Sequence, residues 1–378
     1  MEIYVVKSGD TIDEIANEYN VTSEEISFLN QIPYPYRLAV GQAILIPAGE
    51  VSGDRRTIRT GGYAYPYISN WVLTQTLPYL SKLLVFSYGF TKEGNLLPPQ
   101  VSDERMIEQA VSEGVASVLV LTPFGEDGRF NNQLISAVVR EDSAKENLIN
   151  NLLVTVEQKG FRGVDVDFEY ILAEDRDYFT SFVAELRNRM QAVGVEVSVA
   201  LAPKTSADQQ GLLYEGKDYG GLGAAADEVL LMTYEWGYTY GPAMAVAPLN
   251  KVRQVVEYAL TEIPADKINI GIANYGYDWT LPYVKGESKA VTIGNVEAVQ
   301  IAIENGAEIQ FDEVSQSPFF RYVKDGKEHE VWFEDVRSLQ GKYDLIKEFN
   351  LKGFDVWQIM RFFRAGWELM SDNFLSER

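Results

Sequence analysis

The chain has 378 residues, of which 46% are hydrophobic and 23% charged, as in an ordinary soluble globular protein with a sizeable core. Its net charge of −22 disfavours a nucleic-acid partner or an anionic membrane surface, since both would repel it. There is no cysteine, which excludes disulfides and thiolate metal sites, and the single histidine, His329, argues against a Ser-His-Asp triad or a multi-histidine metal site.

The first residues, MEIYVVKSGDTI, lack the basic leader and the continuous apolar run of a secretory signal. No run of about 18 apolar residues predicts a transmembrane helix. We therefore expect a soluble protein that is made in the cytoplasm without a classical export signal. We also expect it to be a monomer.

Residues 1–48 predict a self-contained βααβ module. Short strands are expected at residues 3–6 and 43–47. Between them, Thr11 and Thr22 each stand three residues before a glutamate, which is the capping-box spacing at the start of a helix. The module therefore contains two helices between two strands.

The stretch YVVKSGDTIDEIANEYNVTSEEISFLNQI, followed by LAVGQAILIP, resembles a LysM module over its full length. The resemblance implies binding of glycans that contain N-acetylglucosamine, in a shallow groove between two loops. The groove residues would be Gly9, Asp10 and Thr11 in one loop and Asn30, Ile32 and Pro33 in the other. A simpler interpretation, in which Gly9 and Asp10 turn the chain and Thr11 caps a helix, is compatible with this role, because the groove is made of turns.

After a polar linker at residues 49–57, residues 58–378 alternate strand-like and helix-like segments. Helices with an apolar face are expected at 143–159 and 177–193. The expected strands are 59–64, 82–89, 117–122, 163–168, 196–202, 228–234, 267–273 and 353–359. This alternation predicts an α/β fold, a (β/α)₈ barrel of the triosephosphate-isomerase (TIM) type. A doubly wound open sheet is the alternative, but no glycine-rich phosphate loop follows the first strand.

The gap between the seventh and eighth strands is too long for one helix. Residues 283–334 contain a helical segment at 295–305 and several short strand-like runs. We interpret them as a small α+β insertion over one side of the barrel mouth.

The fourth predicted strand carries three carboxylates in the stretch GVDVDFE. Side chains alternate along a strand, so Asp165, Asp167 and Glu169 share one face while the valines and Phe168 share the other. In a barrel the acidic face would point inward, where burial and mutual repulsion raise the pKa of carboxyl groups.

Glu169 stands at the carboxyl end of this strand, where barrel enzymes keep their chemistry. A protonated glutamic acid there could protonate the leaving oxygen of a glycosidic bond. The pattern alone leaves two alternatives open: an acidic strip can bind Ca²⁺ or Mg²⁺ in a structural barrel, or it can be solvated.

The stretch RGVDVDFE resembles the D-G-x-D-x-D-x-E signature of glycoside hydrolase family 18, the chitinase-like barrels. MTYEWG at 232–237 and FDVWQI at 354–359 match the family's sixth and eighth strands. Two positions depart from the pattern: Arg162 replaces the first Asp, and Glu235 replaces the Asp after the sixth-strand tyrosine. We expect activity to survive the first change, whereas the second alters a contact to the substrate's acetamide.

The resemblance implies a retaining, substrate-assisted mechanism. Glu169 would act as acid and then as base, while the substrate's own acetamide attacks the anomeric carbon. Asp167 would orient that acetamide, with Asp165 modulating Asp167 from below. Tyr234 would hydrogen-bond the acetamide oxygen, and Trp357 would form the floor of the sugar site.

The same scheme requires no cofactor and no metal ion. Tyr63 and Trp236 are expected to extend the aromatic lining of the site, with Tyr65 and Tyr88 as further candidates. Aromatic side chains also simply pack barrel cores, so the composition alone does not separate the two roles.

One LysM module, the absence of an export signal and the stretch MTYEWGYTYGPAMAVAPL together resemble the cortical fragment-lytic N-acetylglucosaminidases of spore-forming bacteria. The resemblance implies hydrolysis of β-1,4 bonds after N-acetylglucosamine in spore-cortex peptidoglycan, and deposition in the spore coat or cortex region. Chitinase activity is the nearest alternative. A catalytically silent lectin that binds the wall or spore coat is an alternative of another class.

Overall fold

The computed structural model describes residues 1–47 and 55–378. Residues 49–54 of the expected linker lie outside this range. Residues 56 and 57, which were assigned to the linker, belong instead to the first barrel strand. Among the described helices, none combines the length and the apolar character that crossing a membrane would require.

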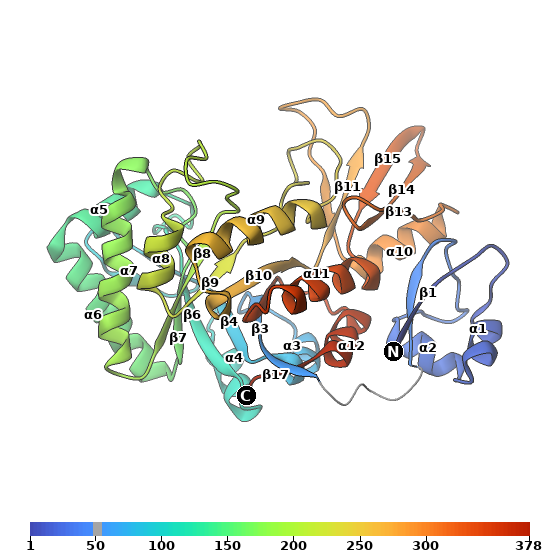
Figure 1. Cartoon of the computed structure of the whole chain (residues 1–378), viewed down its shortest axis with the longest axis horizontal. Helices are drawn as coiled ribbons and strands as arrows, with labels where there is room; N and C mark the ends of the chain where they lie inside the picture. Colours follow the sequence, from blue (N-terminus) through green and yellow to red (C-terminus); the bar gives the residue numbers. More distant parts are fainter. Residues whose placement is uncertain (48–54) are drawn as a thin grey trace.

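The amino-terminal module has the predicted βααβ order, shown in blue in Figure 1. Its elements are β1 (Glu2–Val5), α1 (Ile12–Tyr19), α2 (Ser23–Leu29) and β2 (Ala43–Ile46). The two strands pair antiparallel. Thr11 and Thr22 cap the two helices by accepting the backbone N–H three residues later. Isoleucines of both helices and β2 form the module's own small core.

Eight parallel strands close into a barrel, which confirms the TIM-type fold. Closure is made by the pairing of the first strand with both the second and the last. The barrel strands are β3 (Arg56–Ala64), β4 (Lys82–Phe90), β6 (Ala116–Leu121), β7 (Gly163–Val166), β8 (Glu196–Leu201), β9 (Glu228–Leu231), β10 (Ile268–Ala273) and β16 (Gly353–Trp357). The short β5 (Leu96–Leu97) and β17 (Phe374–Ser376) add to β4 and β3 outside the barrel.

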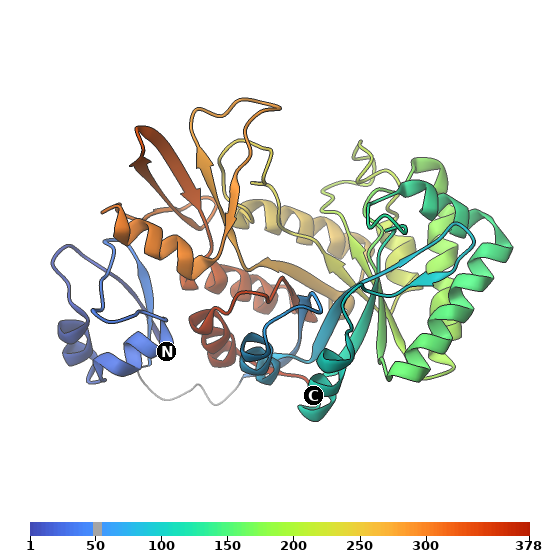
Figure 2. The ribbon, with the colours of Figure 1, turned by 180° about the vertical axis from the view of Figure 1, so that it is seen from behind.

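Helices surround the barrel and bury its outer face (Figures 1 and 2). They are α3 (Asn70–Thr76), α4 (Glu104–Ser112), α5 (Asn132–Arg140), α6 (Asp142–Lys159), α7 (Arg176–Gln191), α8 (Tyr219–Ala225), α9 (Leu249–Glu262), α11 (Val336–Glu348) and α12 (Arg364–Asn373), with 3₁₀ turns at Leu77–Tyr79, Ala173–Asp175 and Ala265–Lys267. Leucine, valine and phenylalanine side chains of these helices pack on the outward-facing strand residues as one continuous core.

The insertion between the seventh and eighth barrel strands is a five-stranded antiparallel sheet covered by one helix. Its elements are β11 (Gly276–Thr280), β12 (Val291–Ile293), α10 (Asn295–Glu304), β13 (Gln310–Asp312), β14 (Ser317–Lys324) and β15 (Lys327–Trp332). It begins at Gly276 and not at residue 283, because β11 pairs with β15. Only Asn274 and Tyr275 separate β10 from β11, so no linker in the sequence marks this boundary.

The amino-terminal module packs directly against the insertion and α12, which both views of the chain show. The Ile309 N–H donates to the Val40 carbonyl at 2.8 Å. The Arg364 guanidinium lies 4.0 Å from the ring centroid of Phe28, and its backbone N–H donates to Oε1 of Gln31 at 2.7 Å. The module is therefore docked on the barrel domain through specific contacts.

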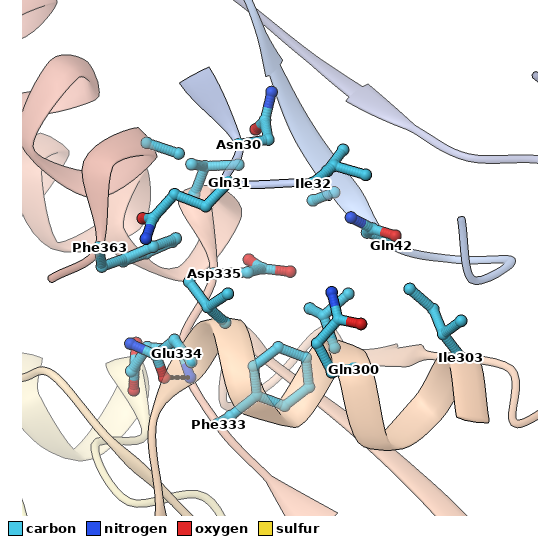
Figure 3. A pocket seen from close by; sticks show the side chains of 16 residues that line it. Asn30, Gln31, Ile32, Gln42, Gln300, Ile303, Phe333, Glu334, Asp335 and Phe363 are labelled. Atoms are coloured by element: carbon cyan, nitrogen blue, oxygen red, sulfur yellow. Dashed lines mark hydrogen bonds between the residues drawn. The ribbon is translucent and has the colours of Figure 1, made fainter. Parts of the chain in front are cut away.

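A small pocket of about 30 Å³ remains at this interface. Figure 3 shows Gln31 and Ile32 of the module facing Gln300 of α10 and Asp335 across it. Its volume is that of a single water molecule, so it is a packing gap and not a ligand site.

Candidate active site

The three carboxylates of the fourth barrel strand lie at the carboxyl end of β7, as their alternation predicts. Asp165 is within the strand, while Asp167 and Glu169 follow its last residue. Phe168 points the other way and stacks on Phe179 and Phe182 of α7 at centroid distances of 5.5 and 6.0 Å. The buried phenylalanine fixes the opposite, inward direction of its acidic neighbours.

Asp165 is the deepest of the three and is fully satisfied. One carboxylate oxygen accepts from the Tyr63 hydroxyl at 2.7 Å, and the other accepts from Ser198 Oγ of β8 at 2.6 Å. Burial raises the pKa of Asp165, while these two hydrogen bonds oppose the shift. Asp165 therefore supports the site from below, and Tyr63 has a polar role that was not predicted for it.

Asp167 is 7% exposed, and its Oδ1 atom has no hydrogen-bond partner within the described structure. Burial, followed by the charges of Glu169 and Asp165, raises the pKa of Asp167 well above its usual range. Burial also raises the pKa of Glu169, with Glu235 adding to the shift and Lys217 opposing it. Crowding at this strand end therefore favours a proton held between the two carboxyl groups.

A pocket of about 560 Å³ opens above these carboxylates at the barrel mouth. Seven of the predicted site residues line it: Tyr63, Asp167, Glu169, Tyr234, Glu235, Trp236 and Trp357. Tyr170, Pro203, Leu213, Tyr214, Met232 and Tyr238 complete much of the wall. Asp165 lies beneath the pocket, held by Tyr63 and Ser198.

Trp357 ends the last barrel strand and forms part of the pocket floor. Its ring lies 5.5 Å from the ring of Tyr63 and 4.9 Å from that of Phe86. Tyr65 stands beside it at 6.2 Å, next to the pocket. The prediction for Tyr88 is wrong: its hydroxyl donates to Asp103 beside α4, on the outer face of the barrel. The irregular pairing of β4 and β6 between Val85 and Tyr88 changes the face that this side chain occupies.

Glu235 is tied to the insertion. Its Oε1 atom accepts from the Tyr275 hydroxyl at 2.5 Å and from the Tyr277 hydroxyl of β11 at 2.7 Å. Its backbone adopts the left-handed region at φ 66°. The longer side chain at this position therefore reaches two tyrosines across the pocket wall, and the carboxylate is held in place before any substrate binds.

Lys217 is a site residue that sequence reasoning missed. It is fully buried, and its ammonium donates to the carbonyl of Phe168, between Asp167 and Glu169. It follows the glycine-containing segment after β8, where no periodic pattern marks a buried side chain. Tyr275 and Tyr277 were missed because the start of the insertion was placed after them.

The six predicted glycan-binding residues of the amino-terminal module differ in how far they are used by the fold of the module itself. Asp10 accepts from the Tyr4 hydroxyl and from the Lys7 N–H, and Gly9 adopts a left-handed conformation at φ 93°. The Asn30 side chain bonds the backbone of Ile26 and Leu45 within the module. Ile32 is buried at the docked side, whereas Thr11 and Pro33 are exposed. Asn30 and Ile32 are thus committed to the fold, and the exposed turn at Gly9 to Thr11 offers the freer surface.

Across residues 1–47 and 55–378, no group of three or more His, Asp or Glu side chains has an arrangement suited to a metal ion. The carboxylates at the end of β7 instead have buried aromatic and lysine neighbours. Burial raises the pKa of all three carboxyl groups, and the charges of Glu169 and Asp165 add to the shift of Asp167, which is an environment suited to general acid-base chemistry.

Two family models match the chain. Glycosyl hydrolases family 18 matches residues 65–361, and the LysM domain matches residues 4–47.

Several known proteins are similar over almost the whole length. The cortical fragment-lytic enzyme of Bacillus subtilis (strain 168) is 38% identical, over 99% of this chain and 98% of that protein. The putative sporulation-specific glycosylase YdhD of the same organism is 34% identical, over 96% of this chain and 86% of that protein. The crystal structure of the spore cortex-lytic enzyme SleL of Bacillus megaterium QM B1551 superposes with a TM-score of 0.94 at 33% identity, covering 99% of this chain and 98% of that one.

Proposed function

The chain belongs to glycosyl hydrolases family 18, and we propose that it cleaves β-1,4 bonds after N-acetylglucosamine in the peptidoglycan of spore-cortex fragments, with its LysM domain binding the glycan. It is a glycoside hydrolase by this membership. Its LysM domain and its barrel imply binding of glycans that contain N-acetylglucosamine, such as peptidoglycan or chitin. The similarity to the cortical fragment-lytic enzyme and to SleL supports spore cortex as the substrate.

The observation that carries the proposed chemistry is Oδ1 of Asp167, which has no hydrogen-bond partner among residues 1–47 and 55–378 and lies with Glu169 in a pocket of about 560 Å³. An unpaired buried carboxylate oxygen costs free energy, and it is positioned to accept an N–H from a ligand. The acetamide of N-acetylglucosamine supplies such an N–H. Asp167 can therefore orient the acetamide so that its carbonyl oxygen attacks the anomeric carbon.

Glu169 is the acid of this proposal. Burial raises its pKa, so the carboxyl group retains its proton nearer to neutral pH and can protonate the leaving glycosidic oxygen. The acetamide oxygen then bonds to the anomeric carbon as the glycosidic bond breaks. Glu169, now ionised, takes a proton from the water that opens this intermediate, and the anomeric configuration is retained.

Tyr234 and Trp357 define the sugar site around these two carboxylates. Tyr234 lines the pocket, and its hydroxyl is the group that would donate to the acetamide oxygen. The Trp357 ring offers an apolar face to the sugar. Arg162 is exposed on the outer surface before β7, away from the pocket, which fits the expectation that this departure from the family pattern leaves activity intact.

We further propose that the protein works as a monomer and is deposited in the spore coat or cortex region after synthesis in the cytoplasm. Its net charge of −22 argues against nucleic acid and anionic membranes as partners. A neutral or weakly charged glycan is compatible with this charge.

Mass spectrometry of soluble products tests the proposal. The purified protein should release fragments with reducing N-acetylglucosamine ends from purified cortex fragments. Glu169→Gln should reduce the rate of this release by about 10²- to 10⁴-fold, while the protein should still sediment with the glycan as the wild type does. Products from chitin oligosaccharides but not from cortex would instead identify a chitinase. Binding without any turnover by the wild-type protein would identify a lectin.

A further inference from the structure

Lys217 stands in an unusual place for a lysine. It follows β8 in the segment 203–218, and its side chain is 0% exposed. Its ammonium donates to the carbonyl of Phe168, and the carbonyl of Ala200 lies 3.5 Å away. The two carbonyls belong to the carboxyl ends of neighbouring strands, so this one group joins the loop to both.

Burying this ammonium group costs free energy. A buried ammonium loses its hydration, and backbone carbonyls replace only part of it. Burial lowers the pKa of Lys217 to about 8, with Asp167 and Glu169 opposing the shift. The two carboxylates are therefore the charges that keep this lysine protonated near neutral pH. The influence is mutual, because the Lys217 charge opposes the raised pKa of both carboxyl groups.

The other groups that face the pair are acidic or neutral. Asp165 lies below Asp167, and Glu235 approaches Glu169 from the insertion side. The phenols that face the pair have raised pKa values and stay neutral: Tyr63 from β3, Tyr65 from the turn after β3, Tyr170 from the turn after β7 and Tyr234 from the segment after β9. Among the groups that act on both carboxylates, Lys217 supplies the positive charge.

We infer that Lys217 is a positioning residue of the hydrolysis: it anchors the backbone between Asp167 and Glu169, and its positive charge favours the state in which this pair of carboxyl groups holds one proton and one negative charge. The inference rests on the proposed function, since it assigns a role within the same site. Without this charge, two crowded carboxyl groups above Asp165 would both favour the protonated form. Asp167 would then not stabilise the positive charge that develops on the acetamide.

The same loop contains a matched control. Lys204 is 1% exposed and donates from Nζ to the carbonyls of Ala207 and Lys217, at 3.2 and 2.9 Å. It is also a buried lysine that ties segment 203–218 together, and it lies outside the set of groups that act on Asp167 and Glu169. Replacing Lys204 disturbs the loop without removing charge from the carboxylate pair.

The test compares pH profiles of kcat/KM on soluble cortex fragments for wild type, Lys217→Met, Lys217→Arg and Lys204→Met. The acidic limb reports the ionisation of the group that must be charged, which is Asp167 in this mechanism. Loss of the Lys217 charge makes that ionisation harder. Lys217→Met should therefore move the acidic limb to higher pH by about one unit, with activity below the midpoint reduced about tenfold.

The controls separate charge from structure. Lys217→Arg should keep the limb near its wild-type position, and Lys204→Met should lower the midpoint of thermal unfolding while leaving the limb in place. An unshifted limb in folded Lys217→Met would overturn the inference, as would the same shift in Lys204→Met. If Lys217→Met does not fold, Lys217→Gln is the second neutral variant. If neither folds, the Arg profile decides, and a shifted limb there counts against the inference.

The outcome is distinct from failure of the proposed function. No turnover by the wild-type protein on cortex fragments would remove the hydrolase proposal itself. A wild-type enzyme that is active and that Glu169→Gln inactivates, together with an unshifted Lys217→Met profile, would remove only the role of Lys217.

Discussion

Two clusters of buried charge occupy opposite ends of the barrel, and they use a lysine in opposite ways. At the amino-terminal end, Lys82 of β4 forms ion pairs with Glu228 of β9 and with Asp355 of β16, the latter at 3.1 Å. At the carboxyl end, the ammonium of Lys217 donates to backbone carbonyls. Both lysines are buried, with exposed fractions of 1% and 0%.

The difference appears in the carboxyl groups. Burial alone would raise the pKa of Glu228, but the charges of Lys82 and Arg59 outweigh it and lower the pKa to about 2. At the other end, burial and the charges of Glu169 and Asp165 raise the pKa of Asp167 well above its usual range, and the opposing charge of Lys217 does not offset them. Direct pairing with two cations thus lowers the pKa of Glu228, whereas crowding among carboxyl groups raises the pKa of Asp167.

Asp355 shows that Lys82 does not fully compensate for the burial of carboxyl groups even at the amino-terminal end of the barrel. Burial raises its pKa to about 6, although Lys82 opposes the shift. The three side chains fit because Gly61 of β3 has no Cβ: one built there would lie 2.0 Å from Oδ1 of Asp355. Lys82 and Arg59 together therefore compensate for the burial of Glu228, whereas Lys82 compensates only partly for that of Asp355.

The largest expected effect on stability follows from removing Lys82, the cation at the amino-terminal end of the barrel. Lys82→Met leaves Glu228 and Asp355 buried without their shared partner, and breaking such a pair costs about 3–5 kcal/mol of unfolding free energy. Urea denaturation at neutral pH measures this loss. Lys82 acts on Asp165 but is not among the groups that shift the pKa of Asp167 or Glu169, so kcat/KM per folded molecule should stay near the wild-type value. A small stability loss accompanied by inactivity would contradict the division between the two ends.

Asp167→Asn should have the opposite effects: it should lower activity without lowering stability. The amide cannot compensate for the positive charge on the acetamide intermediate, so kcat on cortex fragments should fall by about 10²- to 10³-fold. The substitution also removes a carboxyl group whose ionisation is opposed by burial and by the charges of Glu169 and Asp165, so the protein should become more stable at pH 7 by about 1 kcal/mol. Chemical denaturation at pH 7, beside the kinetics, checks both parts. A destabilised Asn variant would mean that Asp167 serves the fold and not the chemistry.

The sequence predicts the buried charged residues at the carboxyl end of the barrel more completely than those at the amino end. The alternation in GVDVDFE placed Asp165, Asp167 and Glu169 inside the barrel, because a strand's period of two is local information. Lys82, Glu228 and Asp355 begin or interrupt apolar strands at widely separated positions, and only barrel closure brings them together. Lys217 was hidden for the same reason, since its partners are carbonyls of two other segments.

The boundaries were less predictable than the elements. The start of the insertion was missed because β10 runs into β11 with only two residues between them. The position of Tyr88 depends on an irregularity in strand pairing, which the sequence does not mark. For the LysM domain, the helix caps were readable from Thr11 and Thr22, but the docking of its second loop on α12 depends on the tertiary structure.

The pH dependence of stability should separate the two clusters further. The folded-state pKa of Glu228 lies below its ordinary value of 4.5, so its contribution is present above pH 4.5 and is lost as the pH falls toward 2. Asp167 has a raised pKa and acts oppositely: it destabilises the fold as the pH rises above about 4. The stability advantage of Asp167→Asn should therefore shrink from pH 7 to pH 4. An advantage that grows on acidification would show that the raised pKa is absent.

The smallest expected effect concerns a third cation, Arg364, which contacts an aromatic ring of the LysM domain. The Arg364 guanidinium lies 4.0 Å from the Phe28 ring centroid of the LysM domain, and its Nε has no hydrogen-bond partner in the described structure. A partly exposed cation–π contact of this kind contributes about 0.5–1 kcal/mol. Arg364→Ala should therefore loosen the docked domain only slightly, raising hydrogen exchange of the α2 amides about two- to fivefold.

Arg253→Ala is the matched control for this contact. Arg253 also lies over a ring, 5.4 Å from the Phe349 centroid, and pairs with Glu348, but both partners belong to the barrel domain. Its removal should leave α2 exchange unchanged. Turnover of soluble fragments should be unaffected in both variants, since neither residue reaches the carboxylate pocket. Equal exchange in α2 of wild type and Arg364→Ala would mean that Val40, Ile309 and the apolar contacts hold the LysM domain without the cation.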